Sequence, residues 1–181
     1  TLLKQAEFTN TLVIINEFGE VGLDHFLVEA SSDTILELSN GCLCCSVRGE
    51  LVDTLLSLDT NTFDRIIIET TGVADPIPVL QSLTAQSELI KRFKPAGILT
   101  VVDSIRGTEI LEHYEEAQNQ LAIADLIYLS KSNHEDANSI EVTKSIRLTN
   151  QYAIILKAPE EIIPTKFDTA TNKNLVSQTH K

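Results

Sequence analysis

The sequence predicts an α/β fold with a mostly parallel sheet and helices on both of its faces. Short apolar runs rich in β-branched residues recur along the chain, and amphipathic stretches separate them. Buried strands that alternate with amphipathic helices are typical of a parallel sheet. The 181 residues suit one domain with a substantial core.

Three strands are expected in the first half, at residues 11–15, 35–38 and 65–68. The third run lacks polar alternation, so we expect it to be fully buried. A helix is expected after Ser46, which can act as its N-cap. The apolar residues of this helix recur at three and four positions: Val47, Leu51, Leu55 and Leu58.

Asp75 and Pro76 predict the start of a second helix, as N-cap and first helical residue. Three apolar side chains of this helix are expected to face the core: Ile77, Leu80 and Leu83.

The second half repeats the pattern, with strands expected at residues 98–102, 126–129 and 152–156. One helix is expected at residues 112–122. Asn133 can cap another, because Glu135 and Asp136 would then lie in its first turn and suit its dipole. Residues 164–181 are polar and aperiodic, which indicates a linker or tail.

Polar residues stand at the ends of the expected strands: Asn16, Glu69, Asp103 and Lys131. In parallel α/β sheets, ligands bind at the carboxyl ends of the strands. The sequence therefore predicts a nucleotide-sized pocket at this edge.

All three cysteines fall within Gly41-Cys42-Leu43-Cys44-Cys45. Adjacent Cys44 and Cys45 are poorly placed to pair with each other, and an odd count argues against a secreted disulfide framework. Three close thiolates suit Zn²⁺ or Cu⁺, with a fourth ligand from elsewhere. The alternative is that the three cysteines are reduced and act as small core residues.

The composition is that of an ordinary globular protein, with 43% hydrophobic and 22% charged residues. A formal net charge of −12 counts against nucleic acid or an anionic membrane as the main partner. The apolar runs are too short to span a bilayer, and no secretory signal is visible. Together with reduced cysteines, this predicts a cytoplasmic protein.

Two further motifs follow expected strands. In Glu69-Thr70-Thr71-Gly72, the carboxylate can orient an attacking or Mg²⁺-bound water, and the glycine amide can approach a phosphate. In Ser130-Lys131-Ser132-Asn133, the lysine stem can lie along a purine ring. Taken alone, the Glu69–Gly72 motif is more often an ordinary strand-end turn, and the Lys131 motif fits a solvated lysine before a helix cap equally well.

In combination, these motifs resemble the CobW/YjiA-type metallochaperone GTPases, a branch of the P-loop GTPases. The resemblance extends from Thr1 to about Leu156. The residues that carry it occur in the family's order: Asn16-Glu17-Phe18-Gly19-Glu20, Gly41-Cys42-Leu43-Cys44-Cys45, Glu69-Thr70-Thr71-Gly72-Val73-Ala74-Asp75-Pro76, Thr100-Val101-Val102-Asp103 and Ser130-Lys131-Ser132-Asn133.

The resemblance implies a P-loop NTPase-like GTPase domain at residues 1–163, joined through residues 164–181 to a smaller C-terminal domain. It also implies GTP-dependent delivery of zinc or cobalt to a client protein, with Mg²⁺ at the nucleotide. A homo-oligomer is compatible with it.

The family's site residues are carried over by position. The metal ligands are Cys42, Cys44 and Cys45, and Glu20 adds an oxygen ligand. Glu69 and Gly72 correspond to the catalytic switch, and Thr70 and Thr71 are expected to contact the nucleotide. Lys131 and Asn133 occupy the base-recognition motif. A metal loop between two γ-phosphate-sensing loops would let hydrolysis release the ion.

The sequence departs from the family pattern in two places. Thr1-Leu2-Leu3 resembles the tail of the family's phosphate-binding loop, so the rest of that loop is expected to lie upstream of Thr1. Little or no GTP affinity or turnover is therefore expected from this polypeptide as written. Asn133 stands where the family has an aspartate that accepts from guanine N1–H and from the 2-amino group. An amide offers one acceptor and one donor, so guanine specificity is expected to weaken by ~1–3 kcal/mol.

Two hypotheses follow. The first is a GTPase core that couples hydrolysis to metal insertion. The second is a metal-binding or sensing module whose nucleotide site has decayed. His25, near Glu20, is the best histidine candidate for a fourth metal ligand, although an exposed loop histidine is the more common case.

Overall fold

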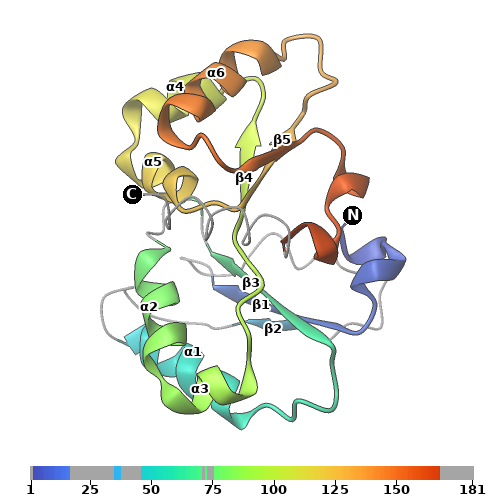
Figure 1. The fold of residues 1–181 in the computed structure, drawn as a ribbon, viewed down its shortest axis with the longest axis vertical. Coiled ribbons are helices and arrows are strands. Elements are labelled where there is room, and N and C mark those ends of the chain that lie inside the picture. The colour runs from blue at the N-terminus through green and yellow to red at the C-terminus, as the bar shows by residue number, and fades with distance from the viewer. Residues whose placement is uncertain (1, 17–34, 38–45, 71, 73–75, 168–181) are drawn as a thin grey trace. The chain divides into compact units, whose positions relative to one another are not determined.

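The computed structural model describes residues 2–16, 35–37, 46–70, 72 and 76–167. The chain separates into two compact units, built mainly from Leu3–Lys94 and from Pro95–Lys181 (Figure 1). Each unit contains its own parallel sheet. The α/β class and the parallel pairing are therefore confirmed.

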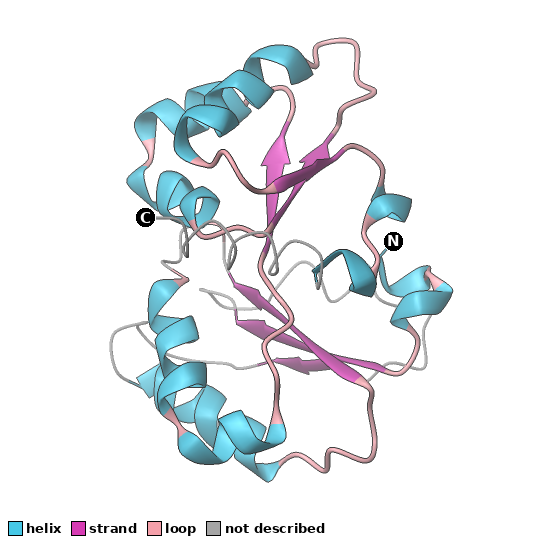
Figure 2. Cartoon of the chain, viewed as in Figure 1, coloured by secondary structure: helices cyan, strands magenta, loops and turns pink. Residues whose placement is uncertain are grey.

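The first unit contains a three-stranded sheet in the order β2-β1-β3 (Figure 2). Its elements in chain order are the 3-10 turns η1 (Leu2–Lys4) and η2 (Ala6–Phe8), β1 (Thr11–Asn16), β2 (Ile35–Glu37), α1 (Ser46–Ser57), β3 (Arg65–Thr70), α2 (Ile77–Ala85) and α3 (Ser87–Arg92).

The core of the first unit lies between one face of this sheet and helices α1 to α3. The pairing of β1 with β3 sets Leu12 opposite Ile66 and Ile14 opposite Ile68. Residues two apart on a strand share a face, so these apolar side chains form one layer. The layer packs against Leu51, Leu55, Val79 and Leu89 of the helices.

The second unit contains a three-stranded sheet in the order β4-β5-β6. Its elements are β4 (Leu99–Asp103), α4 (Gly107–His113), α5 (Glu115–Ala122), β5 (Leu126–Ser130), α6 (Ser139–Thr149), β6 (Ile154–Leu156) and the 3-10 turn η4 (Pro159–Glu161). Residues 164–167 form a further helical turn.

Its core follows the same rule of alternation. Ile127 and Leu129 of β5 are fully buried and pack against Leu121 of α5 and against Val142 and Ile146 of α6. The register of β4 and β5 sets Asp103 opposite Ser130, so the carboxyl ends of these strands meet at one edge.

The predicted strands are all present, but two are less buried than expected. In β3, Ile66, Ile67 and Ile68 are only partly buried, because β3 lies at the edge of the sheet that the described residues form. In β4, also an edge strand, the side chain of Val101 is 60% exposed. The prediction of a fully buried strand at residues 65–68 is therefore wrong.

The helix boundaries differ from expectation in several places. The helix expected at residues 112–122 is two helices, because Tyr114 is extended at their junction. The cap expected at Asn133 is wrong, since α6 begins at Ser139 and is capped by Asn138. Helix α3 was not expected. In α2, Ile77 is exposed and Val79 is buried, contrary to expectation, but Leu83 packs against the core as expected.

No helix in the described ranges combines the length and apolarity needed to cross a membrane.

Candidate functional site

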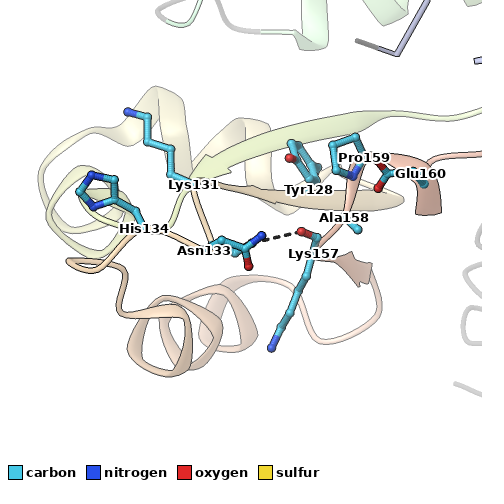
Figure 3. Close-up of a pocket in the computed structure, with 9 residues that line it drawn as sticks. Tyr128, Lys131, Asn133, His134, Lys157, Ala158, Pro159 and Glu160 are labelled. Atoms are coloured by element: carbon cyan, nitrogen blue, oxygen red, sulfur yellow. Dashed lines mark hydrogen bonds between the residues drawn. The ribbon is translucent and has the colours of Figure 1, made fainter. Parts of the chain in front are cut away.

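An open pocket lies at the carboxyl ends of β5 and β6 in the second unit (Figure 3). Its volume is about 460 Å³, which is within the range of small-molecule sites. The lining residues come from β5 itself and from the segments that follow β5 and β6: Tyr128, then Lys131, Ser132, Asn133 and His134, and Lys157, Ala158, Pro159 and Glu160. Polar groups from both loops therefore face one space.

Lys131 is the first residue after β5, and its ammonium group pairs with Asp103 at the end of β4. The distance from Nζ to Oδ2 is 2.6 Å. Oδ1 of Asp103 accepts hydrogen bonds from the backbone amides of Ile105, at 2.7 Å, and Arg106, at 3.2 Å. The carboxylate thus bridges the lysine and the turn after β4.

Hydrogen bonds set the direction in which the pKa of Asp103 is shifted. Burial alone would raise the pKa of this carboxyl group, but the hydrogen bonds from Lys131 and from the two backbone amides outweigh burial and lower the pKa below its ordinary value. A hydrogen bond to the charged form of a carboxyl group favours that form. Asp103 is therefore an anion at neutral pH.

The opposite wall of the pocket is the loop 157–161. Ser132 Oγ donates to the backbone oxygen of Lys157 at 3.1 Å, which ties this loop to the β5 loop. The carboxylate of Glu161 accepts from the backbone N–H of Lys157, at 2.8 Å, and of Ala158, at 3.3 Å. These bonds, led by that from Lys157, lower the pKa of Glu161.

Asn133 and His134 lie between Lys131 and the start of α6. Both are exposed and line the pocket. His134 Nδ1 accepts from the backbone N–H of Asp136 at 3.2 Å and lies 3.5 Å from its carboxylate. Asp136 thus packs beside His134, and Asn133 is the residue that presents an amide to the pocket.

The expected catalytic switch belongs to the first unit. Glu69 and Thr70 are the last residues of β3 and lie opposite Ile15 and Asn16 of β1. Glu69 and Gly72 are exposed, and a side chain at Gly72 would meet no atom of the described residues within 4 Å. Thr71 lies outside the described residues.

The expected metal ligands also lie outside the described residues: Cys42, Cys44, Cys45, Glu20 and the candidate His25. In the part of the chain that is described, no group of three or more His, Cys, Asp or Glu side chains could hold a metal ion. The metal site therefore stays a prediction from sequence.

Sequence reasoning placed Lys131 and Asn133 in one site, and the structure brings both to the pocket. It noted Asp103 as a polar strand-end residue and as part of the motif Thr100-Val101-Val102-Asp103, but it did not assign Asp103 to the site, and it missed the loop 157–161. The same signal could have identified both, namely a polar residue at the carboxyl end of a strand, because Asp103 ends β4 and Lys157 directly follows β6.

The sequence of this chain matches one known protein family. The family model described as "CobW/HypB/UreG, nucleotide-binding domain" matches residues 1–157. The chain belongs to the CobW/HypB/UreG family.

Three relatives in this family illustrate the similarity. The zinc chaperone YjiA of Escherichia coli K12 is 40% identical over 127 residues, covering 67% of this chain and 40% of the relative. The zinc chaperone CobW of a Sinorhizobium species is 31% identical, covering 79% and 49%. The zinc-regulated GTPase metalloprotein activator 1 of Schizosaccharomyces pombe is 30% identical, covering 80% and 37%. The chain thus spans less than half the length of each.

Solved structures support the fold. Zinc-bound YjiA GTPase from Escherichia coli matches 83% of this chain and 57% of its own, with a TM-score of 0.62 and 22% identity. A zinc-bound triple mutant of YjiA, in which one glutamate and two cysteines are replaced by alanine, matches with a TM-score of 0.64 and 26% identity, covering 83% and 49%. Nickel-bound HypB from Helicobacter pylori matches 98% and 77%, with a TM-score of 0.57 and 15% identity.

Proposed function

We propose that this chain is the nucleotide-binding part of a GTP-dependent metallochaperone that delivers zinc or cobalt to a client protein. The observation that carries the proposal is the pocket at the ends of β5 and β6, with Lys131 in its wall, in a chain that matches a nucleotide-binding domain over residues 1–157. The printed names of its relatives, zinc chaperones and a GTPase metalloprotein activator, point to the same class.

At the nucleotide, the pocket of the second unit takes the purine base. The four-carbon stem of Lys131 covers one face of the ring while its amine stays polar. Asn133 meets the Watson–Crick edge with one acceptor and one donor. Thr70 and Thr71 contact the phosphates, the Gly72 amide senses the γ-phosphate, and Glu69 orients the attacking water. Mg²⁺, when bound, neutralises charge on the phosphates.

At the metal, Cys42, Cys44 and Cys45 act as thiolate ligands and Glu20 adds an oxygen. Thiolates suit zinc, and the same set accepts cobalt with more intense colour. The client receives the ion in the cytoplasm after hydrolysis.

The metal half is tested by titrating the reduced chain with Co²⁺ and recording its absorbance. Thiolate-to-cobalt charge-transfer bands should saturate at about one equivalent and vanish when Cys42, Cys44 and Cys45 are changed to Ser. Equal bands in the serine variant would contradict the assignment of these ligands.

The nucleotide half is tested with a fluorescent methylanthraniloyl derivative of GTP, titrated into the protein extended upstream of Thr1 by the phosphate-binding loop, because little or no GTP affinity is expected without that loop. Lys131→Ala should weaken binding, whereas Lys144→Ala should not, because Lys144 is an exposed lysine on α6. Equal weakening by the two substitutions would show that the effect comes from the loss of any positive charge. It would then contradict a base site at this pocket.

A second candidate function is a metal-binding or sensing module with a decayed nucleotide site. Asn133 favours it, because the amide forfeits one of the two hydrogen bonds with which a carboxylate would hold guanine. Under this hypothesis, Co²⁺ binds as described while the nucleotide titration shows no saturable binding.

A further inference from the structure

We propose that Asp103 is a positioning residue, which holds Lys131 in the orientation that the base pocket requires. This inference rests on the proposed nucleotide site. Asp103 belongs to a different strand from the pocket loops and does not line the pocket. It acts on the ligand through Lys131, from which it is separated by 28 residues of chain.

The carboxylate of Asp103 is fixed independently of the lysine. The two amide hydrogen bonds from Ile105 and Arg106 orient Oδ1, which leaves Oδ2 for the ammonium group at 2.6 Å. The side chain of Asp103 is 22% exposed, whereas that of Lys131 is 59% exposed. The less exposed, hydrogen-bonded partner therefore sets the position, and the exposed partner adopts it.

The same turn also holds the backbone of the lysine loop. The amide of Ser104 donates to the oxygen of Ser130 at 3.0 Å, and Ser104 accepts from the amide of Asn138 at 2.9 Å. Lys131 itself has a φ of +55°, a left-handed conformation that is uncommon for a residue with a side chain. Its stem therefore leaves the sheet in a direction set by the turn at residues 103–106.

A long lysine loses rotamer freedom when a ligand fixes it, and this loss opposes binding. Asp103 restrains Lys131 before the ligand arrives, so less freedom remains to be lost. Removing the carboxylate should leave the loop folded, since its backbone bonds remain, but release the amine. Because the pair is partly exposed, we expect nucleotide affinity to fall by about two- to fivefold.

The direct test is NMR on the whole chain labelled with ¹⁵N-lysine, with Lys131→Arg used to assign the Lys131 ammonium signal. In the unchanged chain, the Lys131 ammonium should be more rigid than that of exposed Lys144. In Asp103→Asn it should become as mobile as Lys144, and Glu109→Gln should have no effect. Glu109 is a matched control because it is an exposed carboxylate that pairs with Arg106 beyond the same turn.

A pH series of Lys131 ammonium mobility distinguishes this role from one in which Asp103 only stabilises the fold. In the unchanged chain, the Lys131 ammonium should stay rigid until the pH falls below about 4. In Asp103→Asn it should be mobile at every pH. A mobile Lys131 in the unchanged chain at neutral pH would overturn the inference without any reference to nucleotide.

The second arm compares binding of the methylanthraniloyl derivative of GTP by the same proteins, each extended upstream of Thr1 by the phosphate-binding loop. Weaker binding by Asp103→Asn, with Glu109→Gln unchanged, supports the inference. Equal binding by both variants would overturn the role of Asp103 while leaving the nucleotide site intact. Absence of saturable binding by the unchanged chain would instead overturn the proposed function, and the inference with it.

Discussion

Asn150 is buried, and its side-chain amide bonds to backbone groups of two segments. Nδ2 donates to the carbonyl oxygens of Leu121 and Ala124, both at 2.9 Å. Oδ1 accepts from the amides of Tyr152, at 3.1 Å, and Ala153, at 2.9 Å. The side chain thereby joins the end of α5 to the start of β6.

Replacing Asn150 by Ala should destabilise the protein, because buried backbone donors and acceptors lose their partners. Each such group left unsatisfied costs ~1–3 kcal/mol, so we expect the free energy of unfolding to fall by about 2–4 kcal/mol. Urea unfolding measures this quantity. Gln151→Ala is the control, since Gln151 is exposed and next in sequence. A loss below about 1 kcal/mol for the Asn150 variant would contradict the argument.

At Asn133, the residue type predicts how the base is read. Asn133→Asp restores a second acceptor, so GTP should bind ~1–3 kcal/mol more tightly, about 5- to 150-fold. Inosine triphosphate lacks the 2-amino group, and its affinity should change little. Competition of each nucleotide against the fluorescent derivative measures both. Parallel changes for the two nucleotides would show that Asn133 does not face the 2-position.

Residue type alone could identify Lys131 and Asn133 as site residues, because both follow a strand in a parallel sheet. It could not identify the partner of Lys131. Asp103 and Lys131 meet only because β4 and β5 are neighbours with Asp103 opposite Ser130. Strand order and register depend on the packing of the whole unit, and no local pattern encodes them.

At the scale of elements, the strands were predicted well and the helix ends poorly. Runs such as residues 65–68 are apolar enough to be recognised, but their burial depends on position in the sheet. Asn133 and Asn138 are both competent caps, and the structure uses Asn138, whose own amide is held by Ser104 O at 2.9 Å. Neither Gly nor Pro marks the break at Tyr114, so local sequence did not reveal it.

Two helical glycines predict opposite effects of the same substitution. A Cβ on Gly49 of α1 would meet nothing within 4 Å, so Gly49→Ala should stabilise the chain by about 0.5–1 kcal/mol. A Cβ on Gly107 of α4 would lie 2.8 Å from Val102 Cγ1 and 3.1 Å from Val142 Cγ1. Gly107→Ala should therefore destabilise by about 1–3 kcal/mol through overpacking. Urea unfolding of the pair measures both, and effects of the same sign would contradict the packing at α4.

At the scale of the whole molecule, the balance of 26 acidic against 14 basic residues makes stability depend on pH. Asp103 and Glu161 have pKa values below their ordinary ones. The stability that they contribute is therefore fully present above their unfolded pKa, about 4, and is lost as the pH falls through their folded pKa.

The double variant Asp103→Asn, Glu161→Gln should consequently lose less stability than the unchanged chain between pH 5 and pH 3. Urea midpoints at each pH measure this difference in slope. Glu109→Gln controls for the removal of an exposed carboxylate, and its curve should run parallel to that of the unchanged chain. Three parallel curves would mean that neither hydrogen-bonded carboxylate favours the native state.

The proposed function requires a property of the whole molecule: metal binding and nucleotide binding must each change the affinity for the other ligand. If they do, a coupling free energy of ~1–3 kcal/mol changes the affinity of either ligand by about 5- to 150-fold. Thermodynamic linkage requires that the nucleotide change the metal affinity by the same factor by which the metal changes the nucleotide affinity. The Co²⁺ titration should therefore be repeated at saturating GTP, and the GTP titration at saturating Co²⁺, in magnesium-containing buffer.

Equal, reciprocal factors would support a metallochaperone in which hydrolysis alters metal affinity. Saturable binding of both ligands with no change in either affinity would contradict that coupling. Co²⁺ binding with no saturable GTP binding would favour the metal-binding module, in which the cysteine motif acts alone.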